Sequence, residues 1–122
     1  MTYSIQVTKD AAKELREFPA GVRDSLLEAT KLIGADPFSK ELHGRTKILK
    51  GYEYIYRFED GNRRIFYTAD PDTKEVVVLA YSRRNDLYDK STLRTLDAVD
   101  KAEKRRRGFT EALARLAAFL AD

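Results

Sequence analysis

The sequence lacks several residue types that build cross-links and metal centres. It contains no cysteine and a single histidine, His43, among 122 residues. Without cysteine there is neither a disulfide framework nor a thiolate metal site, and one histidine cannot form a histidine-rich zinc centre. We therefore expect neither a metal nor a cofactor.

Long apolar runs are also missing. No stretch approaches the roughly 20 apolar residues of a membrane span, and the N-terminal MTYSIQVTKD lacks the basic and apolar segments of a signal peptide. The charged fraction of 35% and the mean hydropathy of -0.55 indicate a heavily solvated surface. We expect a soluble cytoplasmic protein with one domain, since a chain of this length can bury one core but not two.

The charge balance alone identifies no partner, because 23 Lys and Arg stand against 20 Asp and Glu, a net charge of +3. Its distribution is more informative. Basic residues outnumber acidic ones only after residue 44, where the arginines concentrate. We therefore expect any polyanion-binding face to lie in the second half of the chain.

The first 35 residues show a strand followed by two helices. Tyr3–Thr8 alternates and is rich in β-branched residues, which predicts a strand. Asp10 is the expected cap of a first helix, which Pro19 ends. A second helix is predicted to end near Gly34. The apolar positions that predict these helices are Ala11, Ala12, Leu15, Phe18, Val22, Leu26, Ala29 and Ile33.

The middle of the chain is strand-like: the segment from Tyr52 to Glu59 alternates, Asp60-Gly61 is a turn pair, and the next segment returns as the hairpin partner. A later apolar run is typical of a central strand buried on both faces. The predicted strands are Thr46–Leu49, Tyr52–Glu59, Arg63–Asp70 and Val76–Tyr81. Together these patterns predict an α+β fold, in which an antiparallel sheet of about four strands packs on an N-terminal helical hairpin.

After Tyr88 the pattern becomes helical again. We predict C-terminal helices interrupted at Gly108, the last of which carries Phe109, Leu113, Leu116 and Leu120 on one stripe. We expect this stripe to pack on the sheet or the helical hairpin, with self-association or docking of a partner as the alternatives. On this basis residues 1–90 form the domain, and residues 91–122 are a helical extension packed on it.

Three segments combine arginine with tyrosine: Tyr54–Phe58, Arg63–Tyr67 and Ser82–Tyr88. In an antiparallel sheet their ends can converge on one face. Arginine makes bidentate, permanently charged contacts with phosphate, and tyrosine can stack on an unpaired base. The sequence therefore indicates an RNA-binding face. The bland alternatives are that Arg57 and Arg64 pair with glutamates across strands, and that the tyrosines belong to the core.

The order of these elements over about residues 2–89 resembles the RelE/ParE toxin superfamily. The resemblance rests on Pro37 with the loop Glu41–Gly44, on Tyr56-Arg57 and Arg64–Tyr67 in the hairpin, and on the spacing from Arg84 to Tyr88. It implies a RelE-like toxin that cleaves mRNA on the ribosome through attack of a ribose 2′-OH on the adjacent phosphate. It also implies a cognate antitoxin as partner.

Carried over by position, the resemblance implies that Arg57, Arg64, Arg84 and Tyr88 are the catalytic residues. Arg64 would clamp the scissile phosphate, and Arg84 would be a further phosphate contact or the acid. Tyr88 would stack on or orient the substrate. We expect Lys47, Lys50, Arg63 and Arg83 to bind RNA around them.

One departure concerns the general base. Arg83 stands where many relatives have histidine, and arginine is a poor base at its usual pKa. Lys47, Lys50 and Glu53 are the alternative bases. The alternative functions are a ParE-like toxin that inhibits gyrase without cutting RNA, and a non-catalytic RNA-binding regulator.

Overall fold

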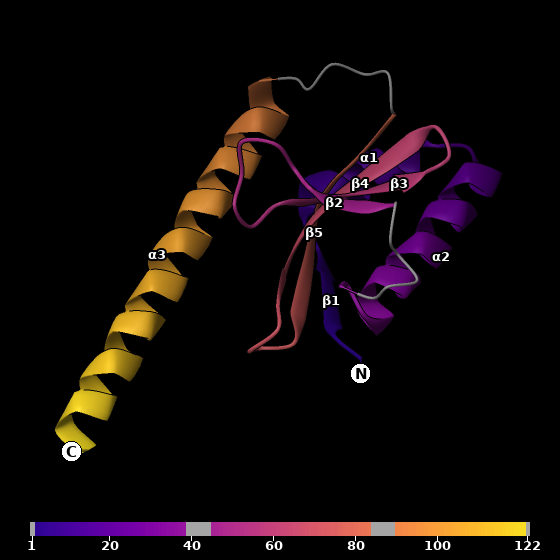
Figure 1. Ribbon diagram of the computed structural model, residues 1–122. Helices are drawn as coiled ribbons and strands as arrows, with labels where there is room; N and C mark the ends of the chain where they lie inside the picture. The colour runs from indigo at the N-terminus through magenta and orange to yellow at the C-terminus, as the bar shows by residue number, and fades with distance from the viewer. Residues whose placement is uncertain (1, 39–44, 84–89, 122) are drawn as a thin grey trace.

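The computed structural model describes residues 2–38, 45–83 and 90–121, and within these ranges a sheet lies between two helical layers (Figure 1). The predicted α+β class is confirmed. The described strands are β1 (Ser4–Val7), β2 (Thr46–Ile48), β3 (Tyr56–Asp60), β4 (Arg63–Asp70) and β5 (Glu75–Arg83). The described helices are α1 (Lys9–Glu17), α2 (Ala20–Ala35) and α3 (Lys90–Ala121). No helix in these ranges is long and apolar enough to cross a bilayer.

The strand order is β1-β5-β4-β3-β2. The predicted antiparallel meander is found in β2 to β5, and the sheet gains a fifth strand because β1 pairs parallel with β5. Parallel strands need a long connection, and the helical hairpin and three strands lie between β1 and β5 in the chain. β5 therefore has neighbours on both sides, and both of its faces are covered, which explains its apolar run. Val78 packs in the core beneath the helical hairpin, and Leu79 packs in the core beneath α3.

The helical hairpin forms as predicted, with two differences of detail. Thr8 rather than Asp10 caps α1, because its hydroxyl accepts a hydrogen bond of 3.1 Å from the Ala11 amide. α2 runs through Gly34 to its end one residue later. A side chain at Gly34 would meet Ile5, since its Cβ would lie 2.2 Å from the Ile5 Cδ1 atom. The missing side chain thus allows α2 to pack closely on β1.

Both helices of the hairpin cover one face of the sheet. Their buried side chains include Ala11, Leu26 and Ile33, which pack against a layer of sheet residues. The sheet side of this cluster consists of Phe58, Ile65, Tyr67, Ala69, Val76, Val78 and Tyr81. This main core holds the β3–β4 hairpin in place from behind.

Residues 49–55 form a turn, although the alternating pattern predicted a strand from Tyr52. The Leu49 amide donates to the Ile55 carbonyl over 2.8 Å, and the Tyr52 amide donates to the Leu49 carbonyl over 3.0 Å. The next two amides donate to the buried carboxylate of Asp100 in α3. These contacts use the backbone groups that a strand would need, so β3 begins only at Tyr56.

The predicted break at Gly108 is wrong, because α3 is one helix of 32 residues. A single glycine destabilises a helix interior by only about 1 kcal/mol relative to alanine, which the surrounding turns can offset. The first half of α3 packs on the second face of the sheet, with Leu96 buried against Ile55 and Phe66.

The expected packing of the distal apolar residues on the domain is also wrong. Phe109, Leu113, Leu116 and Leu120 are 67%, 50%, 54% and 72% exposed. Figure 1 shows the reason: the yellow end of α3 extends away from the sheet. This half of the helix has no part of the described domain beneath it.

Candidate functional site

The β3–β4 hairpin brings two of the predicted catalytic arginines to one face of the sheet. Its two-residue turn places Gly61 at φ +60°, a conformation that favours glycine at the first turn position. The register opposes Glu59 to Arg64 and Arg57 to Phe66. Cross-strand partners project to the same side, so Arg57 and Arg64 share the face on which α3 packs.

Arg57 and Arg64, called here the arginine pair, converge on one carboxylate. The Nη2 atoms of Arg57 and Arg64 lie 3.6 Å and 3.8 Å from the same oxygen, Oε1 of Glu59. Both distances exceed the usual hydrogen-bond range, so these contacts are ion pairs. The three side chains are 23%, 18% and 29% exposed, in that order. Two guanidiniums can therefore contact one anionic oxygen that solvent can reach.

The predicted RNA-binding arginines lie on the other face. Arg63 lies opposite Asp60 of β3 and Arg83 of β5. It directly precedes Arg64, a member of the arginine pair, along β4. A shift of one residue along a strand reverses the side-chain direction. Asp60 also accepts a hydrogen bond of 2.8 Å from Ser25 of α2, which identifies this face as that of the helical hairpin. Arg63 and Arg83 therefore do not join the arginine pair.

Of the two predicted RNA-binding lysines, Lys47 shares the face of the arginine pair. Lys47 on β2 opposes Arg57, so it shares the face of the pair, and it is exposed. Lys50 is exposed in the turn that follows β2. Lys47 thus extends the basic surface to the edge of the sheet.

Two of the four predicted catalytic residues, Arg84 and Tyr88, lie outside the described residues, as do Glu41 and His43. The described part of this end of the sheet stops at Arg83, the last residue of β5. One neighbour of the arginine pair was not singled out from the sequence. Ser82 opposes Arg64, and its buried hydroxyl has no hydrogen-bond partner among the described residues. The register of β5 against β4 would have found it.

The aromatic residues of the hairpin belong to the core, as the bland interpretation expected. Tyr56 stacks on Tyr67 with ring centres 5.5 Å apart. Phe66 and Tyr67 are fully buried. Burial raises the pKa of Tyr67 to about 12, a direction that the Thr46 hydroxyl and the charge of Tyr56 only modify. Tyr56 and Tyr67 lie on the face of the helical hairpin, whereas Phe66 shares the face of the arginine pair. The burial of Phe66 and Tyr67 leaves neither ring free to stack on a base.

A second polar cluster anchors α3. Arg107 lies over the ring of Tyr54 at 4.1 Å and donates a hydrogen bond of 2.9 Å to the Ala69 carbonyl. Arg106 pairs with Asp70 and with Glu103. Two neighbouring arginines of α3 therefore bind the rest of the domain.

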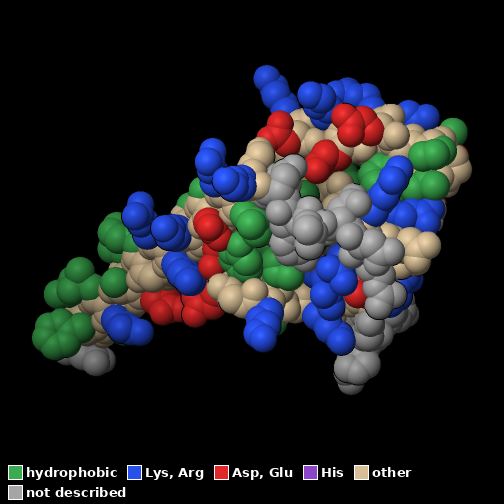
Figure 2. Space-filling view, turned by 90° about the horizontal axis from the view of Figure 1, so that it is seen from above, with side chains coloured by type: hydrophobic (Ala, Val, Ile, Leu, Met, Phe, Trp, Pro, Cys, Tyr) green, Lys and Arg blue, Asp and Glu red, His purple; other side chains and the backbone are tan. Residues whose placement is uncertain are grey.

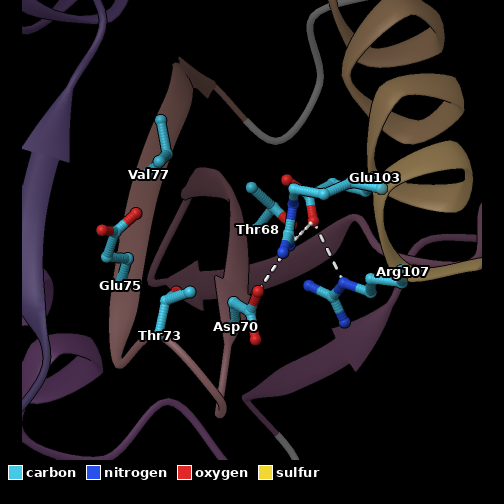
Figure 3. Close-up of a pocket in the computed structure, with 8 residues that line it drawn as sticks. Thr68, Asp70, Thr73, Glu75, Val77, Glu103 and Arg107 are labelled. Carbon is cyan, nitrogen blue, oxygen red and sulfur yellow. Dashed lines mark hydrogen bonds and ion pairs between the residues drawn. The ribbon is translucent and has the colours of Figure 1, made fainter. Parts of the chain in front are cut away.

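The anchoring cluster lines a small pocket of about 140 Å³ between α3 and the ends of β4 and β5 (Figure 3). Burial alone would raise the pKa of Asp70. The amide of Asp72 and the charges of Arg106 and Arg107 outweigh it, so the pKa lies below its ordinary value. In Figure 3 the carboxylates of Asp70 and Glu103 point toward the arginines. Arg106 and Arg107 thus anchor α3 to the sheet, whereas Lys47 is exposed on β2.

A space-filling view shows Lys and Arg side chains spread over the visible face with acidic ones between them, rather than gathered in one patch (Figure 2). Within residues 2–38, 45–83 and 90–121, no group of His, Asp and Glu side chains could hold a metal ion. The arginine pair therefore stands out by its geometry and not by the amount of charge around it.

The chain is similar to RelE toxins in sequence and in fold. The chain is 26% identical over 88 residues to the candidate toxin RelE1 of Methanocaldococcus jannaschii, a match that covers 72% of this chain and 97% of RelE1. No protein-family model matches the sequence. More than a quarter of this chain thus has no counterpart in RelE1.

Solved structures show the same fold. A mutant of Escherichia coli RelE in the free state aligns with a TM-score of 0.61 and 17% identity, covering 80% of this chain and 97% of RelE. The RelE–RelB complex of Pyrococcus horikoshii aligns with a TM-score of 0.59 and 22% identity, covering 71% of this chain and 100% of the other. The resemblance predicted from the sequence is confirmed.

Proposed function

We propose that this chain, which is similar to RelE toxins in sequence and fold, is the RelE-like toxin of a toxin–antitoxin pair and cleaves mRNA bound to the ribosome. The observation that carries the proposal is the arginine pair, whose two guanidiniums meet at a single carboxylate oxygen. A phosphate oxygen bears similar charge and accepts the same contacts. The proposed substrate is therefore a phosphodiester of RNA.

In the proposed reaction the ribose 2′-oxygen forms a bond to phosphorus, and the bond from phosphorus to the 5′-oxygen breaks. Negative charge grows on the phosphoryl oxygens in the transition state. Arg57 and Arg64 stabilise this charge, because arginine stays protonated and its position is set by two paired strands. Such preorganised electrostatic contacts are usually the largest contribution to catalysis.

The remaining predicted residues have supporting roles in this proposal. Arg84 makes a further phosphate contact or protonates the leaving oxygen, and Tyr88 stacks on or orients the substrate. Lys47, beside Arg57, binds a neighbouring phosphate of the strand, and Lys50 continues this path. Arg63 and Arg83 lie on the opposite face of the sheet from the arginine pair. Their proposed contact is therefore with a separate segment of RNA.

Glu59 occupies the position that we assign to the phosphate. We propose that it is a counter-ion that holds the arginine pair in the free protein and is displaced when RNA binds. Glu59→Gln keeps the shape of the side chain and removes its charge, so the affinity for RNA should rise. A displaced counter-ion takes no proton in the reaction, so cleavage should persist in this variant. If Glu59→Gln abolishes cleavage without weakening RNA binding, Glu59 is the base and not a displaced counter-ion.

The proposed partner is an antitoxin protein. Solved structures with this fold include RelE bound to RelB from Pyrococcus horikoshii and an intact RelBE complex from Escherichia coli. We also propose that residues 1–90 form the RelE-like unit and residues 91–122 an extension. The 88 residues that match RelE1 support this division by their number.

The proposal is tested by expressing the chain under tight control and mapping mRNA ends in the cell. Wild type should produce new ends within translated frames, each upstream fragment carrying a 2′,3′-cyclic phosphate. Arg64→Ala should produce none at equal expression. If wild type and Arg64→Ala give identical mRNA ends, the nuclease proposal fails.

The ion pairs of Glu59 with both arginines favour a second candidate, in which these residues are a structural ion-pair network without turnover. That candidate covers a ParE-like gyrase inhibitor and a non-catalytic RNA-binding regulator. Inhibition of gyrase supercoiling with intact mRNA would select the former. RNA binding that weakens with salt, without a cyclic-phosphate product, would select the latter.

A further inference from the structure

The distal half of α3 presents an apolar surface that the domain does not cover. We call Phe109, Leu113, Leu116 and Leu120 the distal stripe. Their spacing of four, three and four residues is that of the a and d positions of a coiled coil. All four are at least half exposed, and Phe119 beside them is 77% exposed. Figure 2 shows hydrophobic side chains gathered at the end of the molecule where this helix projects.

The distal stripe is not a continuation of the surface by which α3 docks on its own sheet. The docked positions are Leu96, Val99, Asp100 and Arg107. At about 100° per residue, the centre of the stripe lies roughly 130° around the helix from the centre of these positions. Bending the helix back would therefore not bring the stripe onto the sheet, and a different surface must cover it.

The charges around the distal stripe restrict what that surface is. Glu111 and Arg115, the charged residues between Phe109 and Leu120, pair with each other at 3.7 Å and are 68% and 82% exposed on the other side of the helix. The flanking e and g positions hold Thr110, Ala112, Ala117 and Phe119, none of which is charged. In coiled coils charged residues at these positions select the partner. A highly charged partner segment would find no counter-charge here.

We propose that the distal stripe pairs with the same stripe of a second copy of this chain, forming a two-helix interface. A second copy always presents a matching apolar strip with small flanking residues, and no like charges oppose each other along it. The contact also explains how the projecting half is stabilised, since a helix of this length is marginal on its own in water. This inference does not depend on the proposed nuclease activity.

The test is sedimentation velocity of the full chain over a range of concentrations. Wild type should shift from the monomer mass of 14.0 kDa toward twice that mass as concentration rises. Leu113→Glu with Leu116→Glu should raise the dissociation constant at least about 100-fold, since each buried apolar anchor contributes tenfold or more. The matched control, Ala114→Glu with Ala118→Glu, adds the same charge to the opposite side of the same helix and should dimerise as wild type does.

A monomeric wild type at every concentration overturns the inference. So does a dimer that persists in the Leu113/Leu116 variant, because it would use another surface. Cross-linking gives an independent measurement, since the chain has no cysteine. Phe109→Cys should form a disulfide with itself in a parallel pair, or with Leu120→Cys in an antiparallel pair. Absence of both products contradicts the proposed interface.

Discussion

Asp100 anchors α3 to the turn before β3, and its removal provides a quantitative test of how this helix is held. The residue is almost fully buried, at 4% exposure. One carboxylate oxygen accepts hydrogen bonds of 3.1 Å and 2.8 Å from the amides of Glu53 and Tyr54. The other pairs with the half-exposed Lys104 at 3.4 Å, which contributes little.

Asp100→Ala leaves two backbone donors without their acceptor. A hydrogen bond to a charged group contributes about 1.5 kcal/mol or more, so the expected loss of unfolding free energy is about 3 kcal/mol. Asp100→Asn keeps an oxygen in place and should lose only about 1 kcal/mol. Asp97→Ala is the matched control on the same helix, because it removes one exposed hydrogen bond from Tyr52.

Urea denaturation followed by circular dichroism gives these free energies, and hydrogen exchange locates the change. The amides of Glu53 and Tyr54 should exchange faster in Asp100→Ala, ahead of those in β4. If Asp100→Ala lies within about 0.5 kcal/mol of wild type, or is no worse than Asp97→Ala, the carboxylate does not hold α3 and the reasoning is refuted.

Three further predictions concern packing and pH. Gly34→Val should destabilise the fold by about 1–3 kcal/mol through its clash with Ile5, measured by urea denaturation. The pKa of Tyr67 is raised to about 12, so its contribution to stability is complete below pH about 10 and is lost as pH rises toward 12. Thermal melts should therefore show that Tyr67→Phe loses less stability at alkaline pH than wild type does. Since the pKa of Asp70 is lowered, its contribution is present above pH about 4 and is lost as pH falls further; Asp70→Asn should weaken this acid loss and, by removing the partner of Arg106, lower stability at neutral pH.

Each of these has a control or a contradicting result. Gly21→Ala should be tolerated, because nothing lies within 4 Å of its added Cβ. Burial also raises the pKa of Tyr56 and Tyr81, so Tyr67→Phe should reduce the alkaline loss rather than remove it. An acid transition that is the same in Asp70→Asn and wild type would show that the contact with Arg106 does not stabilise the fold.

The hairpin of the site was predictable because local signals agree. The prediction that Arg63–Asp70 is a strand is confirmed by β4, because the glycine turn makes this segment the hairpin partner of the alternating segment before it. The parallel pairing of β1 was not predictable in this way. Alternation identifies a strand but does not say which strand it pairs with, and the parallel neighbour lies some 70 residues away.

The site itself was predicted only in part. Arg57 and Arg64 meet as expected, but Arg63 and Arg83 were grouped with them by closeness in sequence rather than by strand face. The period of two would have separated neighbours such as Arg63 and Arg64. The packing of the end of α3 was predicted wrongly for a different reason. Helical periodicity identifies an apolar stripe, but not whether the chain's own domain lies beneath it.

The central claim is that the arginine pair binds the scissile phosphate, and single-turnover cleavage of ribosome-bound mRNA tests it most directly. Arg57→Ala and Arg64→Ala should each lower the cleavage rate by about 10²–10³-fold, the effect of removing one preorganised donor. Arg63→Ala makes the same substitution on the neighbouring residue of the opposite face and should stay within about tenfold of wild type, so long as its melting curve shows a folded chain. Cleavage by Arg64→Ala at the wild-type rate, or an equal loss in Arg63→Ala, would contradict the account.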